Sequence, residues 1–223
     1  MSTRERFERK LNELRADILA MGSLVEEELQ MALEALRTLD PATAQAVTDK
    51  DVIVNQTRFA IEEKCFALIV TQQPAARDLR AIITAMNMIV DLERMGDQAK
   101  GIAKVVHHLQ EFPVQERPTG LEAMGRIGGQ MLHQAMAAYA HDNVDLARIV
   151  ASQDDEVDTI YARVFSDIML RMVQGQKPEQ IEAAYEILRS ARELERFADL
   201  ATNVAERVIY LVTGSMSEIN QDE

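Results

Sequence analysis

The five prolines of this chain all fall between stretches whose apolar residues recur every three or four positions. A proline inside an α-helix costs about 3 kcal/mol, because it removes one backbone hydrogen bond and clashes with the preceding turn. Prolines at the boundaries and none inside therefore predict long, uninterrupted helices. The expected helices are 4–38, 42–71, 76–110, 120–141, 143–174 and 179–213.

The first predicted helix carries a stripe of apolar side chains that runs from Phe7 through Val25 to Leu36. Its steps of three and four residues place the stripe on one face, as in a helix of a bundle. The last predicted helix has a similar stripe of smaller residues, such as Ala191 and Ala198, which lets a neighbouring helix come close. The chain is 47% apolar but only 4% aromatic. This composition is typical of long helices packed through aliphatic side chains, so we expect an all-α fold.

The two halves of the chain resemble each other at a nearly constant offset. Met21-Gly22 recurs as Met124-Gly125, 103 residues later. In the third helix of each half, Leu-Glu-Arg at 92–94 recurs at 194–196, an offset of 102. Chance similarity between helices rich in alanine and leucine would not keep its register across three consecutive helices. We therefore expect a tandem duplication of three-helix bundles.

This duplication defines the expected domains. The first bundle spans 1–112, the second spans 119–214, and a polar tail covers 215–223. The proline-containing segment 111–119 is the natural linker between the bundles.

Charge and composition exclude several classes of protein. A net charge of −13 opposes general nucleic-acid binding, which needs clustered lysine and arginine. No run of 18 or more apolar residues exists, so we do not expect the chain to span a membrane. The single cysteine, Cys65, excludes a disulfide within the chain, which suits the reducing cytoplasm. No glycine-rich phosphate loop is present, and Cys65 has no plausible histidine partner, so we expect no catalysis.

Pairs of oxygen-bearing side chains four positions apart recur in both halves. Residues four apart share one helix face, and two such faces can meet in an antiparallel hairpin. Each half would then gather four side chains at one seam between its second and third helices. The candidate ligands are Asp51, Asn55, Glu93 and Asp97 in the first half, and Asp154, Asp158, Glu195 and Asp199 in the second.

Such acidic pairs often mark only a solvated helix face. Here they recur at the repeat offset and border the apolar stripes, and like charges four apart repel unless something neutralises them. Arg94 and Arg196 could do so as structural ion pairs, but we favour a bound cation. All-oxygen ligands suit magnesium, manganese, calcium or ferric iron, with zinc as a second choice. The second half offers the stronger site, because Asp158 is charged where Asn55 is neutral.

Three motifs occur together in the chain: QPAARDLR at 73–80, DLERMGD at 91–97 and ELERFAD at 193–199. Taken together and in this order, they resemble the PhoU family of regulators of phosphate uptake. The resemblance covers nearly the whole chain, including its duplication. It implies two three-helix bundles that hold metal, often iron or zinc clusters, through the paired E(D)xxxD motifs at the eight candidate ligands.

The resemblance also implies a function. Family members act in the bacterial cytoplasm as negative regulators of the phosphate-starvation response, and many form homodimers. They link the high-affinity phosphate ABC transporter to a membrane sensor histidine kinase. We expect this chain to be a non-enzymatic adaptor of that kind, bound to the membrane only peripherally through its partners. It departs from the family pattern at Gln98 and Leu200, where histidine is frequent.

Three alternatives stay open. The chain could be a metal-free helical scaffold whose acidic pairs are only salt-bridged. It could serve as a PhoU-like partner of a low-affinity phosphate transporter. The third alternative, a carboxylate-bridged metal enzyme, is disfavoured because the expected Glu-x-x-His pairs are absent.

Overall fold

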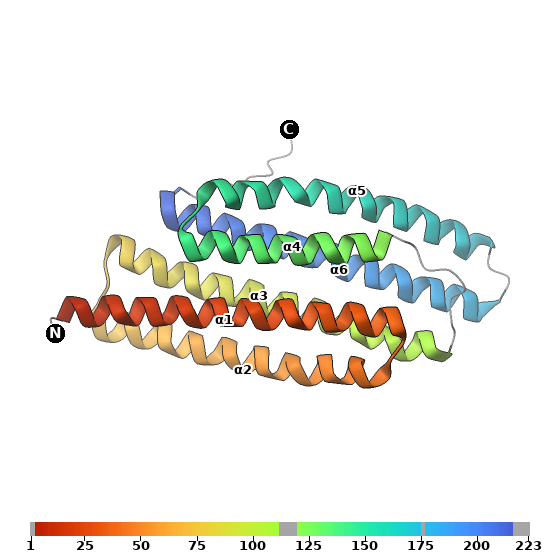
Figure 1. Cartoon of the computed structure of the whole chain (residues 1–223), viewed down its shortest axis with the longest axis horizontal. Helices are drawn as coiled ribbons and strands as arrows, with labels where there is room; N and C mark the ends of the chain where they lie inside the picture. Colours follow the sequence, from red (N-terminus) through yellow and green to blue (C-terminus); the bar gives the residue numbers. More distant parts are fainter. Residues whose placement is uncertain (1–2, 112–119, 175–176, 216–223) are drawn as a thin grey trace.

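The computed structural model describes residues 3–111, 120–174 and 177–215, and within these ranges every regular element is an α-helix (Figure 1). The predicted boundaries are confirmed to within one residue at every helix end. The predicted linker and the polar tail lie almost entirely outside the described residues. The helices are α1 Thr3–Thr38, α2 Pro41–Gln72, α3 Ala76–Glu111, α4 Gly120–His141, α5 Val144–Gln174 and α6 Pro178–Thr213.

Proline and left-handed residues set several helix ends. Pro41 and Pro178 are the first residues of α2 and α6, where a missing backbone N–H costs nothing. The Asp40 carboxylate caps α2 by accepting hydrogen bonds from the backbone N–H groups of the second and third helical residues. Gln73 after α2 and Gly214 after α6 adopt left-handed conformations, with φ of 46° and 75°. These two residues end α2 and α6 shortly after their last buried side chains, Leu68 and Leu211.

The six helices form two three-helix bundles that lie side by side in one elongated molecule (Figure 1). Helices α1, α2 and α3 pack on one another, and so do α4, α5 and α6. The bundles join through α3 against α6 and α1 against α4, which leaves α2 and α5 on opposite outer sides. This arrangement confirms the predicted tandem fold.

Two glycines show that the duplication extends to the way the halves pack. A Cβ on Gly22 of α1 would lie 2.7 Å from Met136 Cε of α4. A Cβ on Gly125 of α4 would lie 2.6 Å from Leu33 Cδ2 of α1. The two glycines are 103 residues apart, and so are Leu33 and Met136, so each contact repeats the other from the opposite half. A larger residue at either position would require the Met136 or Leu33 side chain to move, so glycine suits this close contact of α1 and α4.

A continuous apolar core runs through both bundles and contains Cys65. Burial raises the pKa of the Cys65 thiol to about 11, so it behaves as a small apolar side chain. The few buried acidic side chains include Glu28 and Asp51, which lie close to the predicted first-half seam. No helix among the described residues is long and apolar enough to cross a membrane.

Candidate metal centre

The seam between α5 and α6 brings together the carboxylates predicted in the second half. Asp158 of α5 and Glu195 and Asp199 of α6 each offer an oxygen, and these atoms all lie within 4.8 Å of one another. Within the described ranges, no other group of three or more histidine, cysteine or acidic side chains meets this condition. Three carboxylates in mutual reach suit a hard cation with oxygen ligands.

Asp154 extends this cluster toward the interior. It lies one helical turn before Asp158 on α5, so it faces the same seam. Burial, reinforced by the negative charges of Asp199 and Asp158, raises its pKa to about 7. Oδ1 of Asp154 and Oε2 of Glu195 are buried without a hydrogen-bond partner. Buried carboxylate oxygens without partners are costly, and a bound cation would satisfy them.

Arginines stand near this cluster and offset part of its charge. Burial and the charge of Asp199 raise the pKa of Glu195, although Arg192 and Arg196 act in the opposite direction. The Arg192 guanidinium donates a hydrogen bond to the hydroxyl of Tyr161. Both arginines are exposed. The second-half residues therefore fit a metal ion, which would hold α5 to α6 and neutralise the mutual repulsion.

The equivalent seam between α2 and α3 contains a cation of the chain itself. Lys100 Nζ lies 2.7 Å from Asp51 Oδ2 and 2.6 Å from Asp97 Oδ1. Asn55 Nδ2 also donates to Asp51 Oδ2 at 3.1 Å. The residue equivalent to Lys100 at the repeat offset is Thr202, which carries no charge. A metal ion in the first half would have to displace this ammonium group.

Glu93, the fourth predicted ligand of the first half, faces a different cation. Its Oε1 lies 4.0 Å from Arg58 Nη1, and the same guanidinium lies 3.8 Å from Glu62. Burial and the charge of Asp97 raise the pKa of Glu93. The first-half residues thus line the predicted seam but are divided between Lys100 and Arg58. Metal binding by either half stays a prediction.

One acidic residue near the first seam escaped the sequence analysis. Glu28 of α1 is fully buried, and neither of its carboxylate oxygens has a hydrogen-bond partner. Burial, together with the charge of Asp51, raises its pKa to about 8. The side chain packs so closely on α3 that a Cβ on Gly96 would lie 3.0 Å from its Oε2. A signal was present, because Glu28 follows the stripe residue Val25 by one helical turn.

Comparison with known proteins supports a family assignment. The family model described as the PhoU domain matches the chain twice, over residues 18–106 and 121–208. A phosphate-specific transport system accessory protein PhoU homolog of Clostridium acetobutylicum is 35% identical, over 98% of this chain and 99% of that protein. The accessory protein PhoU of Escherichia coli K12 is 33% identical, over 93% of this chain and 86% of that protein.

Solved structures agree with these matches. The crystal structure of PhoU from Pseudomonas aeruginosa has a TM-score of 0.87 and 37% identity, covering 94% of this chain and all of that chain (100%). The phosphate transport system regulatory protein PhoU from Streptococcus pneumoniae also has a TM-score of 0.87, with 34% identity over 95% of this chain and 99% of that chain. Duplicated motifs, paired bundles and nearly full-length matches lead to one conclusion: this chain belongs to the PhoU domain family.

Proposed function

We propose that this protein is a negative regulator of phosphate uptake and of the phosphate-starvation response in the bacterial cytoplasm. It acts as a non-enzymatic adaptor between the high-affinity phosphate ABC transporter and a sensor histidine kinase. The observation that carries this proposal is the match, over nearly the full length of both chains, to proteins named accessory proteins of the phosphate-specific transport system.

The outer surface of α2 supports an adaptor role. Val52, Phe59 and Phe66 recur every seven residues, and each side chain is about half exposed. Val70 continues the row one turn later and is more exposed still. Large apolar side chains aligned on one exposed helix face are typical of surfaces that contact other proteins. Transporter and kinase subunits, or the second copy in a homodimer, would bury such a surface.

Metal would act in this function by supporting the second bundle. Asp154 and Asp158 of α5 and Glu195 and Asp199 of α6 would hold the ion, which could be iron, zinc, magnesium or manganese. The bound ion supplies positive charge and links the two helices. The carboxylates supply the ligand oxygens, and one oxygen each of the half-buried Asp154 and Glu195 is shielded from water.

Deleting the gene tests the regulatory role. Output from a phosphate-regulated promoter is measured in phosphate-rich medium, with the intact gene restored as the control. Loss of repression in the deletion strain is expected, and unchanged output would reject the role. A pull-down from membranes then identifies the partner, and recovery of a low-affinity phosphate transporter alone would favour that alternative.

Lys100 favours a second candidate, a metal-free scaffold, for the first half only. Elemental analysis of purified protein separates the two possibilities for the second half. Wild-type protein should retain metal after dialysis, and Asp199→Ala should lose it. Equal metal content in the two proteins would indicate adventitious binding and would favour the scaffold.

A further inference from the structure

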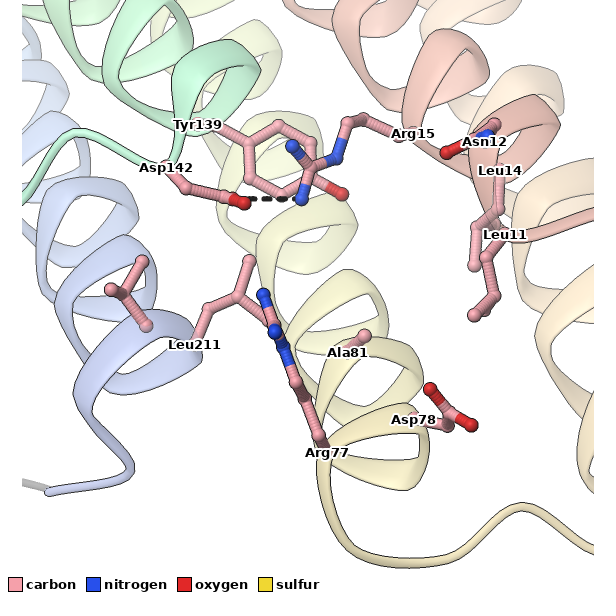
Figure 2. Close-up of a pocket in the computed structure, with 11 residues that line it drawn as sticks. Leu11, Asn12, Leu14, Arg15, Arg77, Asp78, Ala81, Tyr139, Asp142 and Leu211 are labelled. Atoms are coloured by element: carbon pink, nitrogen blue, oxygen red, sulfur yellow. Dashed lines mark hydrogen bonds and ion pairs between the residues drawn. The ribbon is translucent and has the colours of Figure 1, made fainter. Parts of the chain in front are cut away.

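A small cavity lies at the end of the molecule where α1, α3, the end of α4 and the end of α6 converge (Figure 2). Its volume is about 150 Å³, and its walls combine aliphatic side chains such as Leu11 and Leu211 with charged groups. Two lining residues, Arg77 and Asp78, belong to the motif at 73–80, and the proposed adaptor role assigns no function to this motif. The charged residues that line it are Arg15, Arg77, Asp78 and Asp142.

Most of these charges are already paired. Arg15 Nη2 donates to Asp142 Oδ1 at 2.8 Å, and the Arg15 guanidinium lies over the ring of Tyr139, 5.1 Å from its centroid. Asp78 Oδ2 accepts a hydrogen bond of 2.6 Å from Arg4. Arg4 lies outside the lining and also pairs with Glu8. The lining residues thus carry two guanidinium groups and two carboxylates, and among them only Arg77 has no ion pair within the described residues.

Arg77 supplies a guanidinium group that is available to a ligand. It is exposed and forms no ion pair with any residue that the structure describes. Figure 2 shows its side chain extending from α3, past Leu211, toward the pair formed by Arg15 and Asp142. Two guanidinium groups, one from α1 and one from α3, thus line the same cavity. Guanidinium groups present planar sets of N–H donors that match the oxygens of phosphate or carboxylate.

Two residues at the cavity have left-handed backbone conformations. Asp142 has φ of 52°, and Ala76, the residue before Arg77, has φ of 47°. Such conformations are uncommon for residues other than glycine, and Asp142 uses its own to end α4, as Gln73 does after α2. Two of the four non-glycine residues with positive φ in the described chain therefore border this cavity. They fix the starting points of the Arg77 and Asp142 side chains.

We propose that this cavity binds a hydrogenphosphate group between Arg15 and Arg77. The Asp142 carboxylate accepts a hydrogen bond from the O–H group of the ligand. At about 15 Å³ per water, the cavity holds roughly ten water-sized volumes, well below the 300 Å³ or more of sites for drug-sized ligands. It therefore suits an ion of a few heavy atoms. The second oxygen of Asp142 has no hydrogen bond within the described residues. It repels a fully ionised anion such as sulfate but accepts a hydrogen bond from hydrogenphosphate.

This inference rests on the proposed function and extends it, because it places a phosphate-responsive site on the regulator itself. The ligand could be free inorganic phosphate or the phosphate group of an ester. Isothermal titration of the purified full-length chain with inorganic phosphate, glycerol phosphate and sulfate distinguishes them. We expect phosphate to bind at least tenfold more tightly than sulfate. Tighter binding of glycerol phosphate than of phosphate would support the same site and identify an ester as its source.

Variants test the residues. Arg77→Gln should weaken phosphate binding at least tenfold, and its exposed position makes a folding defect unexpected. Asp142→Asn should narrow the preference for phosphate over sulfate, because asparagine keeps the left-handed backbone but loses the charge. The matched control is Arg9→Gln, which removes the same charge from an exposed arginine paired with Glu13. Equal affinity for sulfate, or phosphate binding unaffected by Arg77→Gln, would overturn the proposal.

The promoter assay and the titration together distinguish a failure of the cavity proposal from a failure of the regulatory role on which it rests. If the deletion strain loses repression but the purified protein does not bind phosphate, the cavity proposal fails and the regulatory role stands. If the deletion leaves promoter output unchanged, the regulatory role fails whatever the titration shows. If both succeed, a strain carrying Arg77→Gln should respond to a higher external phosphate concentration than the wild type.

Discussion

Replacing Glu28 with methionine is expected to stabilise the protein. The Glu28 side chain is fully buried, its two carboxylate oxygens have no hydrogen-bond partner, and its pKa is raised from 4.5 to about 8. Methionine has a similar length and occupies the equivalent position of the second half, Met131, which is also fully buried. The core thus already accepts methionine in this packing environment.

The pKa shift sets the magnitude. At pH 7 the Glu28 carboxyl is ionised in the unfolded chain and mostly protonated in the folded one, so folding must take up a proton. Taking up this proton costs about 1.4 kcal/mol for each pH unit above the unfolded-state pKa of 4.5, so the cost is about 3 kcal/mol at pH 7. Because the pKa of Glu28 is higher in the folded state than in the unfolded state, the carboxyl imposes no such cost below about pH 4.5, where it is protonated in both states. The cost increases above pH 4.5 and reaches its full size as the pH rises through about 8. Methionine removes the dependence.

Thermal unfolding at several pH values measures this effect. For a chain of this length, 1 kcal/mol shifts Tm by about 2–4 °C, so Glu28→Met should raise Tm by roughly 6–12 °C at pH 7. The difference should shrink toward pH 4.5 and grow toward pH 8. The control is Glu27→Met at the neighbouring residue, whose side chain is 63% exposed and paired with Lys50. Its loss should change stability by less than about 1 kcal/mol. A destabilised Glu28→Met variant would refute the reasoning and would show that the carboxylate has a compensating partner.

Three further predictions concern the acidic seams. Substituting Lys100→Thr should destabilise the metal-free protein by about 3 kcal/mol in urea unfolding, because it leaves Asp51 and Asp97 without their counter-ion. The same variant should gain metal in elemental analysis, and unchanged metal content would show that the first seam cannot hold an ion. In a matched pair of variants, Asp199→Ala should lose metal whereas Asp97→Ala should keep it. Metal affinity should strengthen as the pH rises through about 7, where the Asp154 carboxyl loses its proton. Titrations at pH 5.5 and 8 measure this change, and Asp154→Asn should flatten it.

The fold was predictable because the sequence carries consistent signals at two scales. Within a helix, proline is tolerated in the first turn but not in the interior, so Pro41 and Pro178 set boundaries that periodicity alone leaves uncertain. The duplication then links the two halves, because a match at a constant offset places equivalent helices at equivalent positions. Long helices with a continuous apolar stripe have few other ways to bury it.

The occupants of the seams were harder to predict. Helical spacing places Asp51 and Asp97 on facing surfaces, and the structure brings both side chains to Lys100. The sequence shows that Lys100 lies three residues after Asp97, but not whether its ammonium group turns toward the seam or toward water. That choice depends on side-chain packing between helices. Arg94, which the sequence analysis considered as a neutralising group, lies exposed, and Arg58 of α2 faces Glu93 instead.

The two seams differ in how their charge is balanced, and this difference has a consequence for regulation. The ammonium group of Lys100 is part of the chain, so the contact between α2 and α3 has its counter-ion under all conditions. The carboxylates between α5 and α6 have no equivalent lysine, because Thr202 stands at that position. Arg192 and Arg196 offset part of their mutual repulsion, and protonation or an ion from solution would relieve it further. Under the proposed function, metal supply would therefore alter the second bundle, α4–α6, and leave the exposed apolar surface of α2 unchanged.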